Sequence, residues 1–248
     1  MIRLGIILAF VASAAGAGPD VSERPVARSA SEVAAIPIAA NPVEVAALSP
    51  GVVSLRPSLR PRAIEQRAAA RRAERRKGQV CGDPDIQGDV VGFVPGRIKG
   101  CGIAEAVRVK SVSGVILSQP ATLDCSAARA LKTWTNKSAK KNLSNIGGGL
   151  ASYRVAAHYA CRTRNNQPGA RISEHGRGKA IDISGFTLRD GSTLTVLKDW
   201  NSRNRALKRM HKDACGTFGT VLGPNSDRFH QDHFHFDTAR HRGGAFCR

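Results

Sequence analysis

The pattern of apolar and polar residues divides the chain into three parts. Residues 4–14 are mostly apolar, follow a short positive start at Arg3, and precede the small residues Ala15-Gly16-Ala17. Residues 18–79 repeat Ala, Val, Pro and Ser without a regular period and contain no aromatic residue that could seed a core. From residue 80 onward, apolar positions recur with the spacing of strands and helices. We therefore predict a signal peptide over 1–17, an unstructured linker over 18–79 and a folded domain over 80–248.

Within residues 80–248, the spacing of apolar positions predicts both helices and strands. Residues 180–183 alternate, so that Asp182 lies on the opposite face from Ile181 and Ile183. Asp190-Gly191 stands between two apolar runs and predicts a hairpin. Because these elements show no regular βαβ repetition, the domain is predicted to be α+β. Loops are predicted at residues 92–96, at Pro120 and over 162–171. Helices are predicted over 126–142, with Ala130, Leu131 and Trp134 near one face, and from a cap at Asp199 to about Lys212. Extended segments are predicted over 106–117, 218–222 and 234–237, and residues 153–159 form either a strand or a helix.

All six cysteines lie in the predicted domain. An even number of cysteines in an exported chain predicts three disulfides, for which 15 pairings exist. Of these pairings we favour 81–101, 125–161 and 215–247. Zinc binding by these cysteines is the weaker interpretation, because no Cys-x-x-Cys motif is present.

The chain is strongly basic, with 38 Lys and Arg against 19 Asp and Glu and a net charge of +19. Such a balance favours an anionic partner. The export signal disfavours nucleic acid. We interpret the basic end of the linker, from Arg56 to Lys77, as a tether to the anionic surface of the cell envelope or as a solvated spacer. Residues 67–77 are able to form a short helix when bound.

Two stretches near the C-terminus hold a candidate metal site. Residues 173–182 read SEHGRGKAID and offer His175 and Asp182, and a later His-x-His motif offers His233 and His235. Side chains two apart in a strand point to the same face. Two histidine nitrogens and one carboxylate oxygen leave a fourth position open to water, which is typical of catalytic zinc sites.

These motifs resemble the zinc D-Ala-D-Ala carboxypeptidases and the penicillin-insensitive murein endopeptidases, which share a fold with D-Ala-D-Ala dipeptidases and the hedgehog signalling domain. Over roughly residues 80–248 the chain more closely resembles the bacterial extensin-like C-terminal domain family. The resemblance implies a hedgehog/DD-peptidase-like zinc domain with a small antiparallel sheet and flanking helices. It is carried by Cys161-Arg162, Ser173-Glu174-His175, Asp199-Trp200, TVLGP at 220–224 and HFHFD at 233–237.

The resemblance also implies the roles of the site residues. His175, Asp182 and His235 match the zinc ligands. His233 matches a catalytic histidine of the carboxypeptidases, and Asp232 matches a catalytic carboxylate of the dipeptidases. A regular strand would present only one of the two to the site, and we favour His233 as the general base.

Further residues are assigned to the substrate. Arg162 is the candidate for binding a substrate carboxylate or stabilising the oxyanion, with Arg164 as its competitor. Ser173 is expected to orient a ligand or the substrate, and His230 matches an extra active-site histidine of the endopeptidases. Asp237 is expected to form a supporting hydrogen bond instead of binding the metal.

The resulting prediction is a zinc metallopeptidase, located in the periplasm or secreted, that acts on peptidoglycan stem peptides as a carboxypeptidase or an endopeptidase. One rival is a wall-binding module that keeps the zinc site for stability or ligand binding. Another is a structural envelope protein without zinc. Asp232 and His233 favour the enzyme, because a purely structural site needs no base beside its ligands. For residues 1–17 an uncleaved anchor is the alternative, although a membrane-spanning helix needs about 20 apolar residues.

Overall fold

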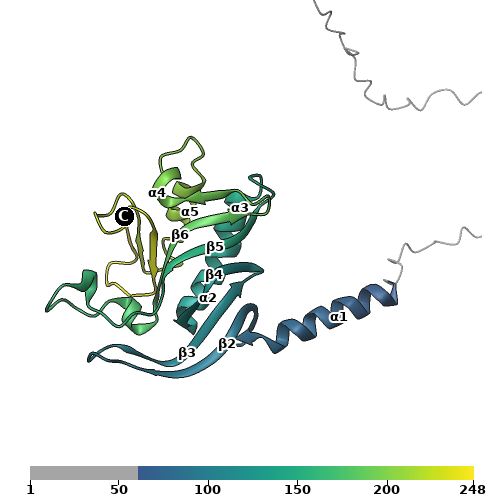
Figure 1. The fold of residues 1–248 in the computed structure, drawn as a ribbon, viewed down its shortest axis with the longest axis horizontal. Coiled ribbons are helices and arrows are strands. Elements are labelled where there is room, and N and C mark those ends of the chain that lie inside the picture. The colour runs from purple at the N-terminus through teal and green to yellow at the C-terminus, as the bar shows by residue number, and fades with distance from the viewer. Residues whose placement is uncertain (1–60) are drawn as a thin grey trace, which may run out of the picture. The chain divides into compact units, whose positions relative to one another are not determined.

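A computed structural model describes residues 61–248, and Figure 1 shows their arrangement. The predicted signal peptide and most of the predicted linker lie outside the described residues. The helices are α1 (Arg62–Lys77), α2 (Cys125–Trp134), the π-helical η1 (Thr135–Ala139), α3 (Lys140–Leu143), the 3-10 turns η2 (Arg164–Asn166) and η3 (Glu174–Arg177), α4 (Val196–Asp199) and α5 (Ala206–Ala214). The strands are β1 (Gln79–Val80), β2 (Asp83–Pro95), β3 (Gly102–Val112), β4 (Val115–Asp124), β5 (Leu150–Ala157), β6 (Ala180–Leu188), β7 (Thr193–Thr195), β8 (Thr220–Leu222), β9 (Phe234–Asp237) and β10 (Phe246–Cys247).

The strands form one ten-stranded sheet in the order β1-β2-β3-β4-β5-β6-β9-β8-β10, with β7 beside β6. The prediction of mixed helices and strands is confirmed. The prediction of a small antiparallel sheet is wrong, because the sheet is large and the pairs β4–β5 and β8–β10 are parallel. Gly92 and Pro120, which were expected in loops, lie inside β2 and β4. Both occupy places where the strand pairing shifts register, and such bulges accommodate glycine and proline within a sheet.

The core lies on the face of the sheet that the helices cover. The predicted helix over 126–142 is confirmed as a continuous helical stretch from α2 through η1 to α3, and Asp124 caps it by accepting a hydrogen bond from the Ala127 amide at 2.8 Å. The Trp134 ring lies 5.8 Å from the ring of Tyr153 and 4.9 Å from that of Phe236. α2 therefore joins the long β2–β4 part of the sheet to the central strands β5, β6 and β9 (Figure 1).

Three predictions of local secondary structure over residues 150–206 can be compared with the structure. Residues 150–157 form strand β5, which decides the open assignment around Tyr153. The hairpin at Asp190-Gly191 is confirmed between β6 and β7. The helix start at Asp199 is wrong, because α5 begins at Ala206 and the Asp199 carboxylate instead accepts a hydrogen bond from the Thr195 amide at 2.7 Å.

All six cysteines are paired, as predicted, but only Cys215–Cys247 has the expected partner. The other disulfides are Cys81–Cys125 and Cys101–Cys161. The expected 81–101 and 125–161 pairs are wrong because Cys81 precedes β2 and Cys101 follows it. A strand of this length separates its ends by about 40 Å.

The basic helix α1 has no buried residue, and its seven basic side chains are exposed. Its C-terminal end is joined to the sheet by an ion pair between Arg75 and Asp85 and by a hydrogen bond from the Gln87 side chain to the Arg75 carbonyl at 2.8 Å. The helix begins at Arg62, earlier than residue 67. Within residues 61–248, no helix has the length and apolar character needed to cross a membrane.

Candidate metal centre

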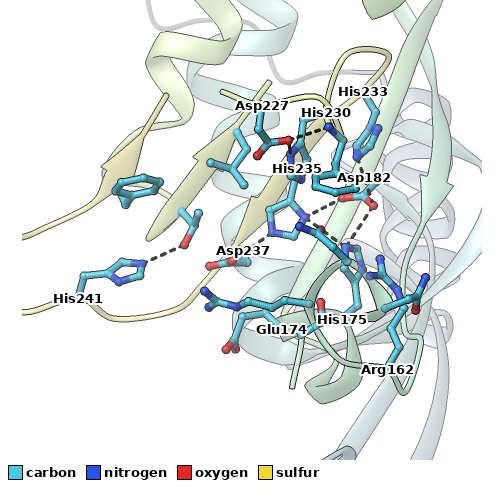
Figure 2. Close-up of a pocket in the computed structure, with 18 residues that line it drawn as sticks. Arg162, Glu174, His175, Asp182, Asp227, His230, His233, His235, Asp237 and His241 are labelled. Carbon is cyan, nitrogen blue, oxygen red and sulfur yellow. Dashed lines mark hydrogen bonds and ion pairs between the residues drawn. The ribbon is translucent and has the colours of Figure 1, made fainter. Parts of the chain in front are cut away.

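Two neighbouring strands and one turn bring the predicted ligands together. Asp182 on β6 lies directly opposite His235 on β9 in the antiparallel register. Because side chains alternate along both strands, Asp182 and His235 point away from the core that Ile181 and Phe236 enter. His175 comes from η3, shortly before β6. Figure 2 shows the three side chains pointing toward one another.

The three side chains form a close, buried group. His235 Nδ1 lies 2.8 Å from Asp182 Oδ1, and His175 Nε2 lies 3.1 Å from Asp182 Oδ2. His175 Nε2 and His235 Nδ1 are 3.2 Å apart. One ligand atom from each residue lies within 4.8 Å of the others, and all three residues are buried. The structure thus brings together the three residues that the motifs predicted as ligands.

Neighbouring acceptors select which ring nitrogen of each histidine faces the centre. His175 Nδ1 lies 2.8 Å from the carbonyl oxygen of His158 and therefore donates to it, which leaves Nε2 as an acceptor. His235 Nε2 lies 3.1 Å from Asp237 Oδ2 and donates to this carboxylate, so Nδ1 is the nitrogen that would bind a metal after losing its own proton. With that proton lost, two nitrogen lone pairs and a carboxylate would converge on one point. Such a donor set, with its outer hydrogen bonds, fits a divalent metal such as zinc.

The ionisable groups of the centre shift one another's pKa strongly. Burial alone would lower the pKa of His235, but hydrogen bonds to Asp182 and Asp237 outweigh it and raise this pKa to about 9. Burial alone would raise the pKa of Asp182, but its contacts with the His175 and His235 rings hold this pKa well below its usual range. The buried carboxylates are thus compensated by a proton on His235. A bound cation would replace this proton.

His233 and Asp232 form a pair beside the centre. His233 Nε2 lies 3.6 Å from Asp182 Oδ2, and its Nδ1 lies 2.8 Å from Asp232 Oδ1. Strand β9 begins only at Phe234, so the alternation that would have separated residues 232 and 233 does not apply to them. The Asp232 side chain is 65% exposed and is bonded to His233. His233 and Asp232, the two alternatives for the general base, are therefore hydrogen-bonded to each other.

A cavity of about 580 Å³ opens over the centre. Ser173 lines it and caps η3, since its Oγ accepts a hydrogen bond from the His175 amide at 3.4 Å. His230 is held by Asp227 at 2.7 Å, with its ring 5.5 Å from that of His235. Every predicted site residue except Asp232 lines the cavity, namely Arg162, Ser173, His175, Asp182, His230, His233 and His235, and the competing Arg164 lines it as well.

Some features of the site have no signal in the sequence. The His158 carbonyl that fixes the His175 ring is a backbone group, so no residue type could indicate it. At the other end of the cavity, His241 Nε2 lies 2.9 Å from Thr220 Oγ1, and Phe246 also lines the wall. The predicted supporting bond of Asp237 is present, because its carboxylate accepts from His235.

Comparison with protein families shows which family the chain matches. The family model described as "Extensin-like protein C-terminus" matches residues 93–248, a span that begins inside β2 and contains the whole candidate centre. No curated protein and no solved structure matches the chain.

Proposed function

The chain belongs to the extensin-like C-terminal family, and on this premise we propose that it is an exported zinc metallopeptidase-like protein that hydrolyses stem-peptide or cross-link bonds of peptidoglycan. The observation that carries the proposal is the convergence of His175 Nε2, His235 Nδ1 and the Asp182 carboxylate, with the histidine base candidate His233 beside them. A hedgehog/DD-peptidase-like arrangement of the domain is part of the same proposal. The three disulfides support an oxidising compartment, the periplasm or the exterior.

His175, Asp182 and His235 would hold the zinc ion. When bound, zinc polarises a scissile carbonyl and makes water a nucleophile near neutral pH. The residues around it then have separate tasks. The His158 carbonyl fixes the ring of His175, and the Asp237 carboxylate fixes the ring of His235.

Proton transfer is assigned to His233. Donation from its Nδ1 to Asp232 leaves Nε2 free to accept a proton on the side of the metal centre. Asp232 stabilises the imidazolium that forms and fixes the ring, so it acts as a positioning residue. Arg162, on the cavity wall, supplies a guanidinium that pairs with a substrate carboxylate or with the developing oxyanion. Ser173 and His230 also line the cavity and would contact the substrate there.

The decisive experiment measures release of D-Ala or cleavage of cross-links from defined muropeptides, with zinc assayed on each variant. His233→Ala should lower turnover by about 10²–10⁴-fold with zinc content unchanged, because that is the usual contribution of a general base. Asp232→Asn should have a milder effect, since the amide oxygen still accepts from His233. Arg162→Ala should mainly raise KM if Arg162 binds a carboxylate, or lower kcat if it faces the oxyanion. Full activity in His233→Ala would contradict the assignment of the base.

A second candidate function is a non-catalytic wall-binding module that retains the zinc site. The basic helix α1 favours it, because seven exposed basic side chains with no apolar face suit an anionic envelope surface better than a protein core. Wild-type protein that carries full zinc and binds muropeptides without cutting any would favour this module. In either case, deletion of residues 18–79 should reduce sedimentation with isolated cell walls at low salt, where charge attraction is least screened.

A further inference from the structure

The turn that carries His175 is held differently from the strands that carry the other two ligands. Asp182 and His235 are fixed by the pairing of β6 with β9. The chain that leads from β5 to η3 has only the short turn η2 and an isolated bridge between Thr163 and Ile172. Strand pairing therefore does not orient the His175 ring, and other contacts must do so.

Residues 158–162 supply these contacts on one side of the turn. The His158 carbonyl accepts from His175 Nδ1 at 2.8 Å, and the Ala160 amide donates to the His175 carbonyl at 3.3 Å. The Ser173 amide donates to the Arg162 carbonyl at 3.0 Å. Cys161 thus lies in the middle of the segment that contacts the ligand turn most closely.

The disulfide partner of Cys161 contacts the same turn. Cys101 lies 60 residues earlier, at the end of the β2–β3 loop. A Cβ atom added to Gly176 would lie 2.9 Å from Cys101 Sγ, and Arg177 Nε donates to the Gly100 carbonyl at 3.4 Å. The turn therefore packs against two segments that the Cys101–Cys161 disulfide joins covalently.

We propose that the Cys101–Cys161 disulfide is a positioning element of the metal centre. It keeps the His158 carbonyl against the His175 ring, and this hydrogen bond holds Nε2 toward Asp182 and His235. Without the cross-link, this irregular segment, which is not paired with the sheet, opens locally, and the His175 ring loses its fixed tautomer. The inference rests on the proposed metal-binding function and adds a covalent element that the ligand motifs do not contain.

The first test compares two double variants of the full mature chain. Cys101→Ala with Cys161→Ala should bind zinc about 10–100-fold more weakly in competition with a chelating dye, the usual effect of removing support from a metal ligand. The matched control is Cys81→Ala with Cys125→Ala, because those cysteines pack against the apolar core. The control should lower Tm and leave zinc affinity unchanged. Equal losses of affinity in both variants, or no loss in the first, would overturn the proposal.

A second readout does not depend on the metal. Nitrogen-15 spectra of the histidine rings in metal-free wild type should show His175 as a single Nδ1–H tautomer, and the Cys101/Cys161 variant should show averaging. If wild type binds no zinc, the proposed function fails, and this spectrum still decides the positioning role. An unchanged tautomer would refute it.

A third variant covers the case in which the double variant does not fold. Gly176→Ala keeps all three disulfides and places a methyl group 2.9 Å from Cys101 Sγ, 3.1 Å from Ile172 Cγ2 and 3.4 Å from the Ala160 carbonyl oxygen, which forces the turn away from the cross-linked segments. Weaker zinc binding with intact disulfides supports the proposal. Unchanged affinity and an unchanged His175 tautomer would contradict it.

Discussion

The two faces of the β6–β9 strand pair are both buried, but their chemistry is opposite. On one face Phe236 is fully buried and lies 4.9 Å from Trp134 and 4.8 Å from Phe218. On the other face His235, only 8% exposed, contacts the Asp182 carboxylate. The apolar face is complete through packing alone. The polar face brings together buried carboxylates and histidine nitrogens whose charge must be balanced by a cation or a proton. The contribution of this face to the stability of the fold therefore depends on what is bound there.

The largest expected effect follows from removing a ligand on the polar face. Wild-type protein should contain about one zinc ion per chain, and His235→Ala should contain none. Zinc at 1,000 times its Kd should stabilise wild type by about 4 kcal/mol, and this stabilisation should be absent in the variant. Elemental analysis and thermal unfolding with and without chelator measure both effects. Equal zinc in the two proteins would contradict the ligand assignment.

On the apolar face, Phe236→Ala should lower the free energy of unfolding by about 3–5 kcal/mol, because it leaves a cavity among packed aromatic rings. The loss should be the same with chelator and with zinc, which distinguishes this face from the other. Denaturant unfolding under both conditions is the measurement. A loss that appears only in the presence of zinc would show that the two faces are not independent.

A smaller effect is expected from the carboxylate behind His235. Asp237→Asn keeps an acceptor for His235 Nε2 but removes its charge, and zinc affinity should fall about 10–100-fold while the fold remains intact. Asp227→Asn is the matched control, since Asp227 pairs with His230 outside the ligand group. Chelator competition should show little change for the control. A similar loss in both variants would point to a general charge effect.

The smallest expected effect concerns His211, a histidine on the apolar side whose ring lies 5.4 Å from that of Trp200 and 5.1 Å from that of Phe234. Burial lowers its pKa below the ordinary value of 6.5. The unfolded chain therefore binds a proton more readily than the folded one, and the stability that neutral His211 contributes is lost as pH falls below about 6.5. His211→Phe should lose less stability than wild type on acidification.

Thermal unfolding from pH 8 to pH 5 in the presence of chelator tests this sign, because the metal centre then contributes equally to both proteins. A difference in Tm between wild type and His211→Phe that stays constant with pH would show that His211 does not titrate in this range.

Local periodicity, together with the resemblance of the motifs to a known family, was sufficient to predict the three residues that meet in the candidate centre. Alternation placed the Asp182 side chain on the opposite face of its strand from the apolar Ile181. His235 likewise alternates with two buried phenylalanines along its strand. The spacing of the motifs indicated the family, which the match over residues 93–248 shows. These features depend on neighbours within a few residues, so a single stretch of sequence contains them.

Tertiary structure alone decided the disulfide partners, the size of the sheet and the pairing of Asp232 with His233. Cys101 meets Cys161 because the loop at the tip of the long β2–β3 hairpin lies beside η3, the turn that carries His175. No rule of sequence spacing encodes that contact. The His158 carbonyl, a group common to every residue type, acquires its role only from its position beside His175. Sequence patterns thus determined which side chains share a face, because backbone geometry repeats locally. The contacts that orient those side chains join distant segments and depend on how the whole domain packs.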